Sequence, residues 1–304
     1  MLDKSNQFIL LIRLIRPHTL PLAVSGVICA NALSYALGGY FSFVIGFLLL
    51  STAVFLQILS NLANDYGDMI KGADLYRDKN APKRLIQQGK ISRATLKIMI
   101  VLTLLSSLIS GSCLLFASLF TIKQWLLFLG LGTLSLVAAI TYTIGRYAYG
   151  YMALGEVAVF LFFGILAVVG GFYLQTKTCN VLILFPACGL GLLCATVLHI
   201  NNIRDIDGDK KAGKITLANL LGLKKAKMLH MGFLFAAILL YGLFICLTQL
   251  WGGLLICFTL PQLFKHLKAL SKAQNPQKIG QELKNVVLLT WWVNCYFSLG
   301  VVIF

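Results

Sequence analysis

Acidic side chains are rare in this chain, and most of them lie in two short segments. The sequence has ten Asp and Glu residues, and seven of them lie in residues 65–78 or 205–209. An asparagine precedes the first aspartate of each segment by four residues, Asn61 in one case and Asn201 in the other. Oxygen atoms at this spacing lie on one face of a helix, and carboxylate and carboxamide oxygens are preferred ligands of Mg²⁺. The two segments therefore predict a magnesium site, with solvated loop charges as the alternative.

The same two segments are also rich in basic residues. A diphosphate that approached carboxylates alone would meet a repulsion of about 4 kcal/mol per close pair at an effective dielectric constant near 20. Metal ions and basic side chains supply the opposite charge, so the mixture predicts a phosphorylated ligand. The basic residues are Lys71, Arg77, Lys79, Lys83 and Arg84 in the first segment, and Arg204, Lys210, Lys211 and Lys214 in the second.

Long apolar stretches lie between the polar segments. The chain of 304 residues is 59% hydrophobic and 12% charged, whereas a soluble domain carries about 25% charged residues. A helix of about 20 apolar residues crosses the hydrocarbon core. We therefore predict an all-α, polytopic membrane protein with about nine transmembrane helices around a central cavity that opens laterally to lipid. The stretches are Leu20 to Gly38, Phe41 to Leu62, Thr95 to Phe120, Gln124 to Ile144, Met152 to Leu174, Val181 to Ile203, His230 to Gln249, Trp251 to Phe264 and Val286 to Phe304.

The distribution of basic residues predicts the orientation of these spans. With nine spans and a cytoplasmic N-terminus, all Lys and Arg residues except Lys123 and Lys177 lie on the cytoplasmic side. This arrangement places the C-terminus outside and both acidic segments inside. It also explains the net charge of +16 without a nucleic-acid partner, so the expected partner is the lipid bilayer.

Polar side chains form a stripe on two of the expected helices. Polar groups inside a bilayer must face the protein interior or a water-filled cavity. The stripes therefore predict one transmembrane domain over residues 1–304, in which two related bundles, about 20–145 and 150–304, each bring an acidic helix end to a shared cavity. The stripes are Gln57, Asn61, Asn64, Asp65 and Asp68 on the second span, and Thr196, His199, Asn202, Asp205 and Asp209 on the sixth.

The sequences NDYGDMIKGAD, from Asn64, and NNIRDIDGD, from Asn201, resemble the two aspartate motifs of the UbiA superfamily of intramembrane aromatic prenyltransferases. The resemblance covers essentially the whole chain from Arg16 onward. With RPHTLPL and ITYTIGR, it is greatest to the members that prenylate 1,4-dihydroxy-2-naphthoate for menaquinone. Two positions depart from the superfamily pattern: Gly72 stands where NDxxDxxxD ends, with Asp74 as the expected replacement, and the lysine of YxxxK is replaced by Arg146.

The resemblance implies a magnesium-dependent prenyltransferase. The expected reaction moves a polyprenyl group from polyprenyl diphosphate to 1,4-dihydroxy-2-naphthoate with loss of CO₂ and diphosphate, giving demethylmenaquinone. The expected location is the bacterial cytoplasmic (inner) membrane, with the active-site loops on the cytoplasmic side. Prenyl chain length, the catalytic base and the oligomeric state are left open. Two alternatives also stay open: another aromatic acceptor, such as 4-hydroxybenzoate or homogentisate, and an ion-coupled transporter.

The resemblance also assigns roles to individual residues. Glu156 is expected to act as a base or as a partner of Arg146, and Tyr147, Tyr149 and Tyr151 are either cation-stabilising rings or an interfacial belt. The implied metal ligands are Asn64, Asp65, Asp68, Asp74, Asp205 and Asp209. The implied diphosphate-binding residues are Lys71, Arg146, Arg204 and Lys210, the implied catalytic residues are Asp68, Asp205, Tyr142 and Arg146, and the implied acceptor-binding residues are Arg16, His18 and His199.

Overall fold

The structure, a computed structural model, describes residues 4–72, 85 and 88–303, and it is helical throughout apart from turns and one isolated bridge between Met152 and Ile215. The all-α prediction is confirmed for this part of the chain. The main helices are α1 (Lys4–Ile15), α2 (Leu20–Gly38), α3 (Phe43–Lys71), α4 (Arg93–Ser118), α5 (Ile122–Thr141), α6 (Gly155–Val159), α7 (Gly171–Thr176), α8 (Leu184–Arg204), α9 (Ile206–Lys211), α10 (Leu217–Thr248), α11 (Leu260–Lys272) and α12 (Pro276–Ile303). Short 3-10 turns occupy Pro17–Thr19, Tyr149–Tyr151 and Val181–Ile183, a longer one covers Trp251–Thr259, and π-helix Phe160–Gly170 joins α6 to α7.

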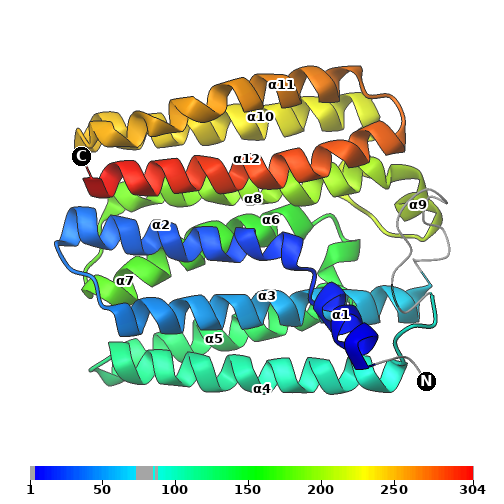
Figure 1. The fold of residues 1–304 in the computed structure, drawn as a ribbon, viewed down its shortest axis with the longest axis horizontal. Helices are drawn as coiled ribbons and strands as arrows, with labels where there is room; N and C mark the ends of the chain where they lie inside the picture. The colour runs from blue at the N-terminus through cyan, green and yellow to red at the C-terminus, as the bar shows by residue number, and fades with distance from the viewer. Residues whose placement is uncertain (1–3, 73–84, 86–87, 304) are drawn as a thin grey trace.

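The long helices have roughly parallel axes (Figure 1), and together they make this chain a multi-pass membrane protein. Eight of the described helices are long and apolar enough to cross a membrane. The eighth expected span, Trp251 to Phe264, is present but is not one regular helix, because it consists of a 3-10 segment, Trp251–Thr259, followed by α11. The number nine is therefore approximately right. The two ends of the chain lie at opposite ends of the bundle (Figure 1).

The irregular eighth span packs closely against its neighbours. A Cβ atom built on Gly300 of α12 would overlap the carbonyl group of Gly252, and one built on Gly253 would lie 2.7 Å from Cγ1 of Ile245 on α10. The segment Trp251–Thr259 is thus wedged between α10 and α12. Pro261, in the first turn of α11, has no backbone N–H and is well suited to the start of a helix.

The helices form two groups in the bundle. In Figure 1, α3, α4 and α5 lie in one half, α8, α10, α11 and α12 lie in the other, and α2, α6 and α7 lie between them. The largest apolar core joins α2, α8, α10 and α12, and a second core joins α3, α4 and α5. Whether residues 20–145 and 150–304 are related repeats stays a prediction.

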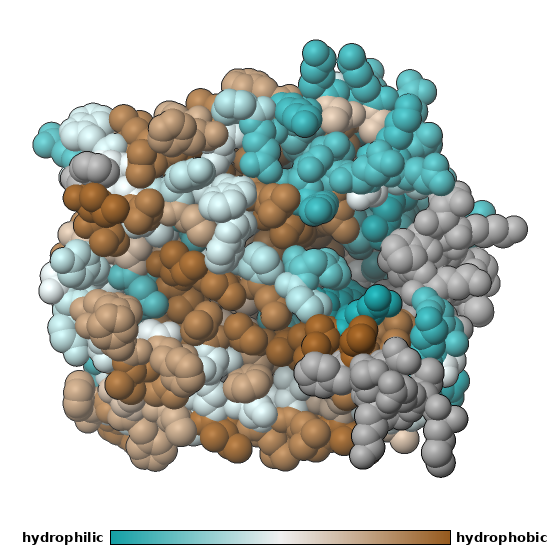
Figure 2. Space-filling model, in the orientation of Figure 1, coloured by the Kyte–Doolittle hydropathy of each residue, from teal (hydrophilic) through white to brown (hydrophobic). Residues whose placement is uncertain are grey.

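The two acidic segments lie where α3 and α8 end. α3 continues past its apolar residues as far as Lys71, and Gly72, with φ 66°, ends it in a left-handed conformation that glycine adopts without strain. α8 ends at Arg204, and the short helix α9 follows directly. Hydrophilic side chains gather at the end of the molecule where α9 lies, and apolar ones cover much of the remaining visible face (Figure 2).

A glycine contact between the π-helical segment and α8 gives the first prediction. A Cβ atom on Gly164 would lie 2.5 Å from the carbonyl oxygen of Ala187 and 2.6 Å from Cα of Gly191. We expect Gly164→Ala to lower the free energy of unfolding by about 1–3 kcal/mol, because the helices must separate. Thermal unfolding of the detergent-purified protein measures the effect. The matched control is Gly130→Ala in α5, where a Cβ atom would meet nothing within 4 Å; equal melting temperatures for the two variants would contradict the prediction.

Candidate active site

The first acidic motif lies on the last turns of α3 and is tied to the N-terminal segment. Arg16, which has a left-handed φ of 57°, donates a hydrogen bond from its guanidinium group to the buried carboxylate of Asp65. One turn earlier on α3, the Asn61 side-chain amide donates to the hydroxyl of Thr19 at 2.9 Å and to the carbonyl oxygen of Ile15 at 3.1 Å. These contacts hold the segment between α1 and α2 against the motif.

The end of α5 fixes the other side of the same motif. The Thr143 hydroxyl donates to the carbonyl oxygen of Ala63 at 3.0 Å. A Cβ atom on Gly67 would overlap Thr143, so the glycine of NDYGD is needed for this close approach. Residue type and spacing alone did not indicate this role for Gly67.

Asp68 faces a tyrosine from the loop that precedes α6. The Tyr151 hydroxyl donates to Oδ1 of Asp68 at 2.8 Å, and the Lys71 ammonium lies 4.1 Å from the centre of the same ring. The Lys214 ammonium lies 5.9 Å from that ring. The ring of Tyr151 therefore lies between a lysine that follows the first motif and a lysine that follows the second.

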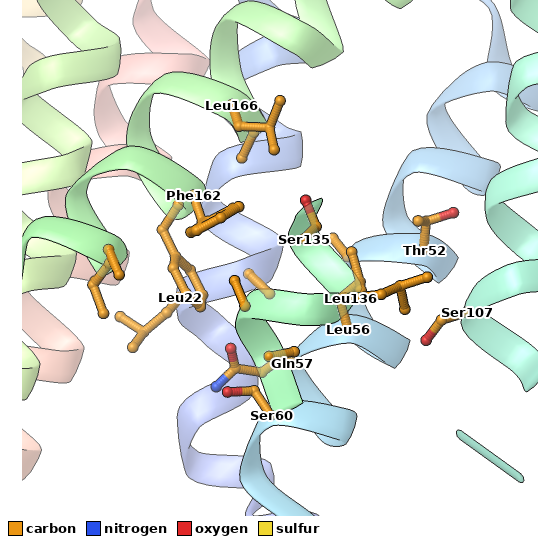
Figure 3. A pocket seen from close by; sticks show the side chains of 18 of the residues that line it. Leu22, Thr52, Leu56, Gln57, Ser60, Ser107, Ser135, Leu136, Phe162 and Leu166 are labelled. Atoms are coloured by element: carbon orange, nitrogen blue, oxygen red, sulfur yellow. The ribbon is translucent and has the colours of Figure 1, made fainter. Parts of the chain in front are cut away.

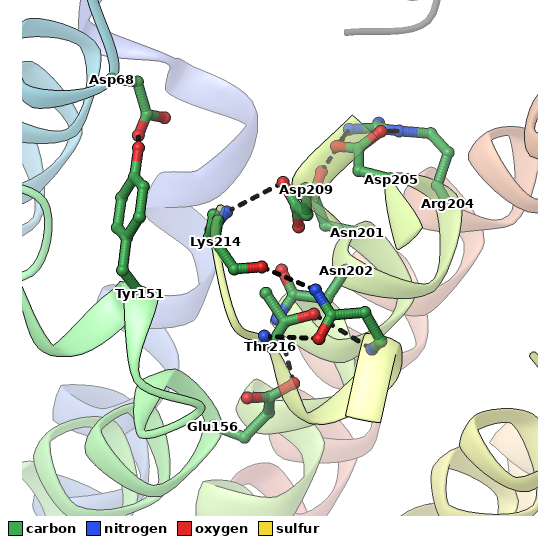
Figure 4. A network of polar contacts seen from close by, with 11 residues as sticks. Asp68, Tyr151, Glu156, Asn201, Asn202, Arg204, Asp205, Asp209, Lys214 and Thr216 are labelled. Atoms are coloured by element: carbon green, nitrogen blue, oxygen red, sulfur yellow. Dashed lines mark hydrogen bonds and ion pairs between the residues drawn. The ribbon is translucent and has the colours of Figure 1, made fainter. Parts of the chain in front are cut away.

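The second motif pairs its acids with neighbouring cations (Figure 4). The Arg204 guanidinium donates to Oδ1 of Asp205 at 2.7 Å, contacts Oδ2 of the same carboxylate, and donates to the side-chain oxygen of Asn201 at 2.7 Å. The Lys214 ammonium lies 3.5 Å from Oδ1 of Asp209. The second oxygen of Asp209, Oδ2, is buried, and no described protein atom bonds to it.

The acids of the two motifs lie close enough together to affect the same pKa values. Burial raises the pKa of Asp209 to about 6; the Lys214 ammonium opposes this rise, and the carboxylates of Asp205 and Asp68 add to it. The pKa of Tyr142 is raised above its ordinary value by burial and then by Glu156, Asp68 and Asp209. The Tyr151 hydroxyl bonds to Asp68, and the Lys214 ammonium, 5.9 Å from the centre of the same ring, lies 3.5 Å from Asp209, so the two carboxylates share one region.

A cavity of about 450 Å³ extends from this region into the bundle (Figure 3). Polar side chains line one part of it, and Gln57 and Ser60 are drawn side by side there. Farther along, the lining is mostly apolar, with the hydroxyl groups of Thr52, Ser107 and Ser135 among the apolar side chains (Figure 3). The predicted central cavity is therefore confirmed, while its opening to lipid stays a prediction. The polar lining includes Arg16, His18, Asn61, Asn64, Tyr142 and Asn201, and the apolar lining includes Leu49, Leu114, Leu115, Phe128, Leu131 and Leu174.

Several predicted site residues lie elsewhere. Lys210 is exposed on α9, and the exposed Arg146 has its guanidinium 5.5 Å from the ring centre of Tyr147. His199 is fully buried and is not part of the cavity wall formed by the described residues. Asp74, the expected replacement at the end of the first motif, lies outside the described residues.

Three contacts differ from what the sequence indicated. Glu156 accepts from Asn202 and pairs with His199, and so its partner in the structure is not Arg146. Tyr151 was expected only as a ring that stabilises a cation or belongs to a belt, but its hydroxyl holds Asp68. Lys214 was one basic residue among many, although the turn at Gly213, with φ 67°, aims it back at Asp209.

The acidic residues fit a hydrated divalent cation better than a closed metal cage. Among the described residues, no three His, Cys, Asp or Glu side chains are grouped closely enough to hold a metal ion by themselves. Mg²⁺ usually takes one or two protein carboxylates and fills its other positions with water and substrate phosphates. The unpartnered, buried Oδ2 of Asp209 and the nearby carboxylate of Asp68 match that requirement.

Sequence comparison identifies the family. A profile of the UbiA prenyltransferase family matches residues 23–293. The chain belongs to the UbiA prenyltransferase family. It is 42% identical to the 1,4-dihydroxy-2-naphthoate octaprenyltransferase of Haemophilus influenzae over 95% of this chain and 94% of that protein. It is 39% identical to the Escherichia coli enzyme of the same name over 94% of this chain and 93% of that protein.

Solved structures of UbiA homologues share the fold. The apo structure of a homologue from Aeropyrum pernix K1 matches with a TM-score of 0.65 at 18% identity, over 96% of this chain and 97% of that one. A homologue from Archaeoglobus fulgidus bound to DMAPP and Mg²⁺ matches with a TM-score of 0.58 at 19% identity, over 96% of this chain and 98% of that one. At these identities the structural likeness establishes the UbiA fold.

In this UbiA family protein, the contact between Tyr151 and Asp68 gives the second prediction. We expect Tyr151→Phe to lower the free energy of unfolding by about 1.5–3 kcal/mol, the usual loss for a hydrogen bond to a charged group. The ring stays in place beside Lys71, so only the hydroxyl contact is removed. Tyr147→Phe is the matched control, because Tyr147 is 74% exposed. Thermal unfolding in detergent compares the two, and an unchanged melting temperature for Tyr151→Phe would show that the contact is absent.

Proposed function

We propose that this protein transfers a polyprenyl group from polyprenyl diphosphate to 1,4-dihydroxy-2-naphthoate, releasing CO₂ and diphosphate and forming demethylmenaquinol, the reduced form of demethylmenaquinone. The observation that carries the proposal is the meeting of two acidic and basic motifs beside a cavity that continues into apolar surroundings. Relatives named for this activity, at 42% and 39% identity over nearly the whole chain, support the choice of acceptor. The cytoplasmic membrane, with the motifs on its cytoplasmic side, is the proposed location.

The two ends of a polyprenyl diphosphate need opposite surroundings. The hydrocarbon tail gains nothing from water, and the apolar lining around Phe128 and Leu131 accepts it. The diphosphate needs cations, and Lys71, Arg204 and Lys214 stand beside the acids of the two motifs. Arg146 and Lys210, which are exposed in this structure, are proposed to approach the diphosphate from the loops.

Charge exchange is the main task of the motif residues. Each described acid of the first motif and the acids Asp205 and Asp209 of the second already have a cationic or phenolic neighbour. An arriving diphosphate competes for those cations, and the acids are then freed to bind Mg²⁺. When bound, Mg²⁺ would neutralise the diphosphate and make it a better leaving group. The proposed ligands are Asn64, Asp65, Asp68, Asp74, Asp205 and Asp209.

Bond cleavage leaves positive charge on the prenyl group, which the cavity must stabilise without reacting. Tyr142 lines the cavity, and its ring packs edge to face on Tyr149 with centres 5.3 Å apart. Aromatic faces attract cations, and the raised pKa of Tyr142 keeps its phenol protonated and weakly nucleophilic at neutral pH. We assign Tyr142 to this role.

The acceptor is proposed to bind on the polar side of the cavity near Arg16 and His18, which both line it. In the reaction, the allylic C–O bond breaks and its electron pair leaves with the diphosphate. The ring carbon that carries the carboxylate forms the new C–C bond. The C–CO₂ bond then breaks, and its electron pair restores the aromatic ring. Because CO₂ takes the place of the proton usually lost in such a substitution, no base needs to remove a ring proton.

Acceptor choice gives the third prediction. Membranes that contain the protein, Mg²⁺ and a labelled prenyl diphosphate should form prenylated product with 1,4-dihydroxy-2-naphthoate. Label in the acceptor carboxyl group should appear as CO₂ in equal amount, because prenyl attack and loss of CO₂ occur at the same carbon. Parallel reactions with 4-hydroxybenzoate and homogentisate serve as controls. A higher kcat/KM with either control acceptor than with 1,4-dihydroxy-2-naphthoate would contradict the proposed substrate.

The second motif gives the fourth prediction, with a control on the same short helix. Asp209→Asn should lower kcat by about 10²-fold or more, because it removes the carboxylate charge with which Asp209 would hold Mg²⁺ against the diphosphate. Asp207 lies on α9 as well but is exposed, and Asp207→Asn should change kcat by no more than about twofold. Steady-state kinetics on equal amounts of membrane-inserted protein measure both. Similar rates for the two variants would remove Asp209 from the site.

A further inference from the structure

Two buried glutamates contact histidines inside the helix bundle. The sequence has two glutamates and four histidines. Glu156 pairs with His199 at 2.8 Å, and Glu282 pairs with His266 at 2.7 Å, although these glutamates are only 3% and 8% exposed. Ionisable groups are costly in a membrane protein interior, so such pairs usually serve a purpose beyond packing.

The hydrogen-bond partners of His199 specify where its protons lie. Nε2 faces the carbonyl oxygen of Ala226 at 3.1 Å, and a carbonyl oxygen only accepts, so Nε2 carries a proton. Nδ1 faces Oε1 of Glu156, which also accepts from the side-chain amide of Asn202 at 3.0 Å. One proton is therefore shared between His199 and Glu156, and the contacts of the pair join α6, α8 and α10.

The Glu156–His199 pair connects the segments that carry the two acidic motifs. Glu156 lies in the first turn of α6, just after Tyr151, whose hydroxyl holds Asp68. His199 and Asn202 lie on the last turns of α8, which leads directly into Asp205. Figure 4 shows Glu156 and Asn202 on the side of the network away from Asp205 and Arg204. Neither Glu156 nor His199 is among the described residues that line the cavity, so the pair contacts the segments that carry the motifs without forming the cavity wall.

Other contacts hold α8 on either side of the pair, and α10 and α12 pack along its length. The close approach of Gly164 to Gly191 fixes α8 nearer its middle. Beyond Asp209, the chain returns to the Tyr151 segment, where the Ile215 amide donates to the carbonyl oxygen of Tyr151 at 3.2 Å and the Ala153 amide donates to that of Ile215 at 2.9 Å. Between these two attachments, Glu156 holds the last turns of α8 from the side.

We propose that Glu156 and His199 are positioning residues that set the second acidic motif at the correct place relative to Asp68. This inference rests on the proposed function, because it assumes that the two motifs hold Mg²⁺ and a diphosphate together. It assigns no contact with substrate to either residue. A residue that orients metal ligands typically changes metal affinity by about 10–100-fold when it is removed.

The test removes the hydrogen bonds of the Glu156 side chain and keeps a side chain of similar size. Glu156→Leu should raise the Mg²⁺ concentration for half-maximal prenyl transfer by about tenfold and leave the acceptor KM unchanged. Glu156→Gln keeps an acceptor for Asn202 but does not keep the shared proton with His199, so it should shift the Mg²⁺ dependence clearly less than Glu156→Leu. Asn202→Ala, which removes one contact of Glu156, is a milder second variant and should shift the Mg²⁺ requirement in the same direction.

The second glutamate provides the matched control. Glu282→Leu breaks the equivalent contact with His266, between α12 and α11, and should lower thermal stability without changing the Mg²⁺ requirement. If Glu282→Leu and Glu156→Leu raised the Mg²⁺ requirement by the same factor, general destabilisation would be responsible and the proposal would be overturned.

A binding measurement separates this inference from the proposed reaction. The melting temperature of purified protein is measured with and without Mg²⁺ plus inorganic diphosphate, which requires neither prenyl group nor acceptor. We expect stabilisation of the wild type, Glu156→Gln and Glu282→Leu, and a clearly smaller shift for Glu156→Leu and Asn202→Ala. Equal shifts for Glu156→Leu and wild type, or no shift in the wild type, would overturn the positioning role. A wild type that shows the shift but no prenyl transfer would contradict the proposed function alone.

Discussion

The hydrocarbon core of a membrane offers no hydrogen bonds, and this constraint determines where polar groups stand in the protein. Polar side chains within the bundle must find partners there, as Asn61 does with Thr19 and as Glu156 does with His199. Acidic groups that must meet a charged ligand lie instead at the ends of α3 and α8. The apolar cavity between the helices can then continue directly from that polar end.

Concentrating carboxylates at one place is unfavourable unless cations accompany them. Arg16 contacts Asp65, Arg204 contacts Asp205, and Lys214 contacts Asp209. Arg204 directly precedes Asp205 in the sequence, whereas Arg16 lies 49 residues before Asp65. A compact site with both signs of charge is suited to a ligand that brings negative phosphates and positive metal ions together.

Close helix contacts supply the rigidity that the polar site needs. Glycines at positions 67, 164 and 300 let backbone or small side chains touch where a Cβ atom would collide. Through Gly67, the first motif is pressed against Thr143 at the end of α5, and through Gly164 the π-helical segment lies against α8. The eighth expected span also packs closely, with Gly252 against Gly300, and it is a 3-10 segment followed by a helix, which apolar length alone does not reveal.

The sequence by itself determined the helical membrane fold, the approximate number of spans and the two acidic segments, because hydrophobic length and i, i+4 spacing are local properties. The tertiary structure decided which partners these segments take. Tyr151 and Lys214 were not distinguished from other residues of their type, and Glu156 was assigned the wrong candidate partner, because their contacts in the structure join distant helices. Hydrophobic periodicity tells which face of a helix is buried, but only packing in three dimensions tells which side chain lies opposite.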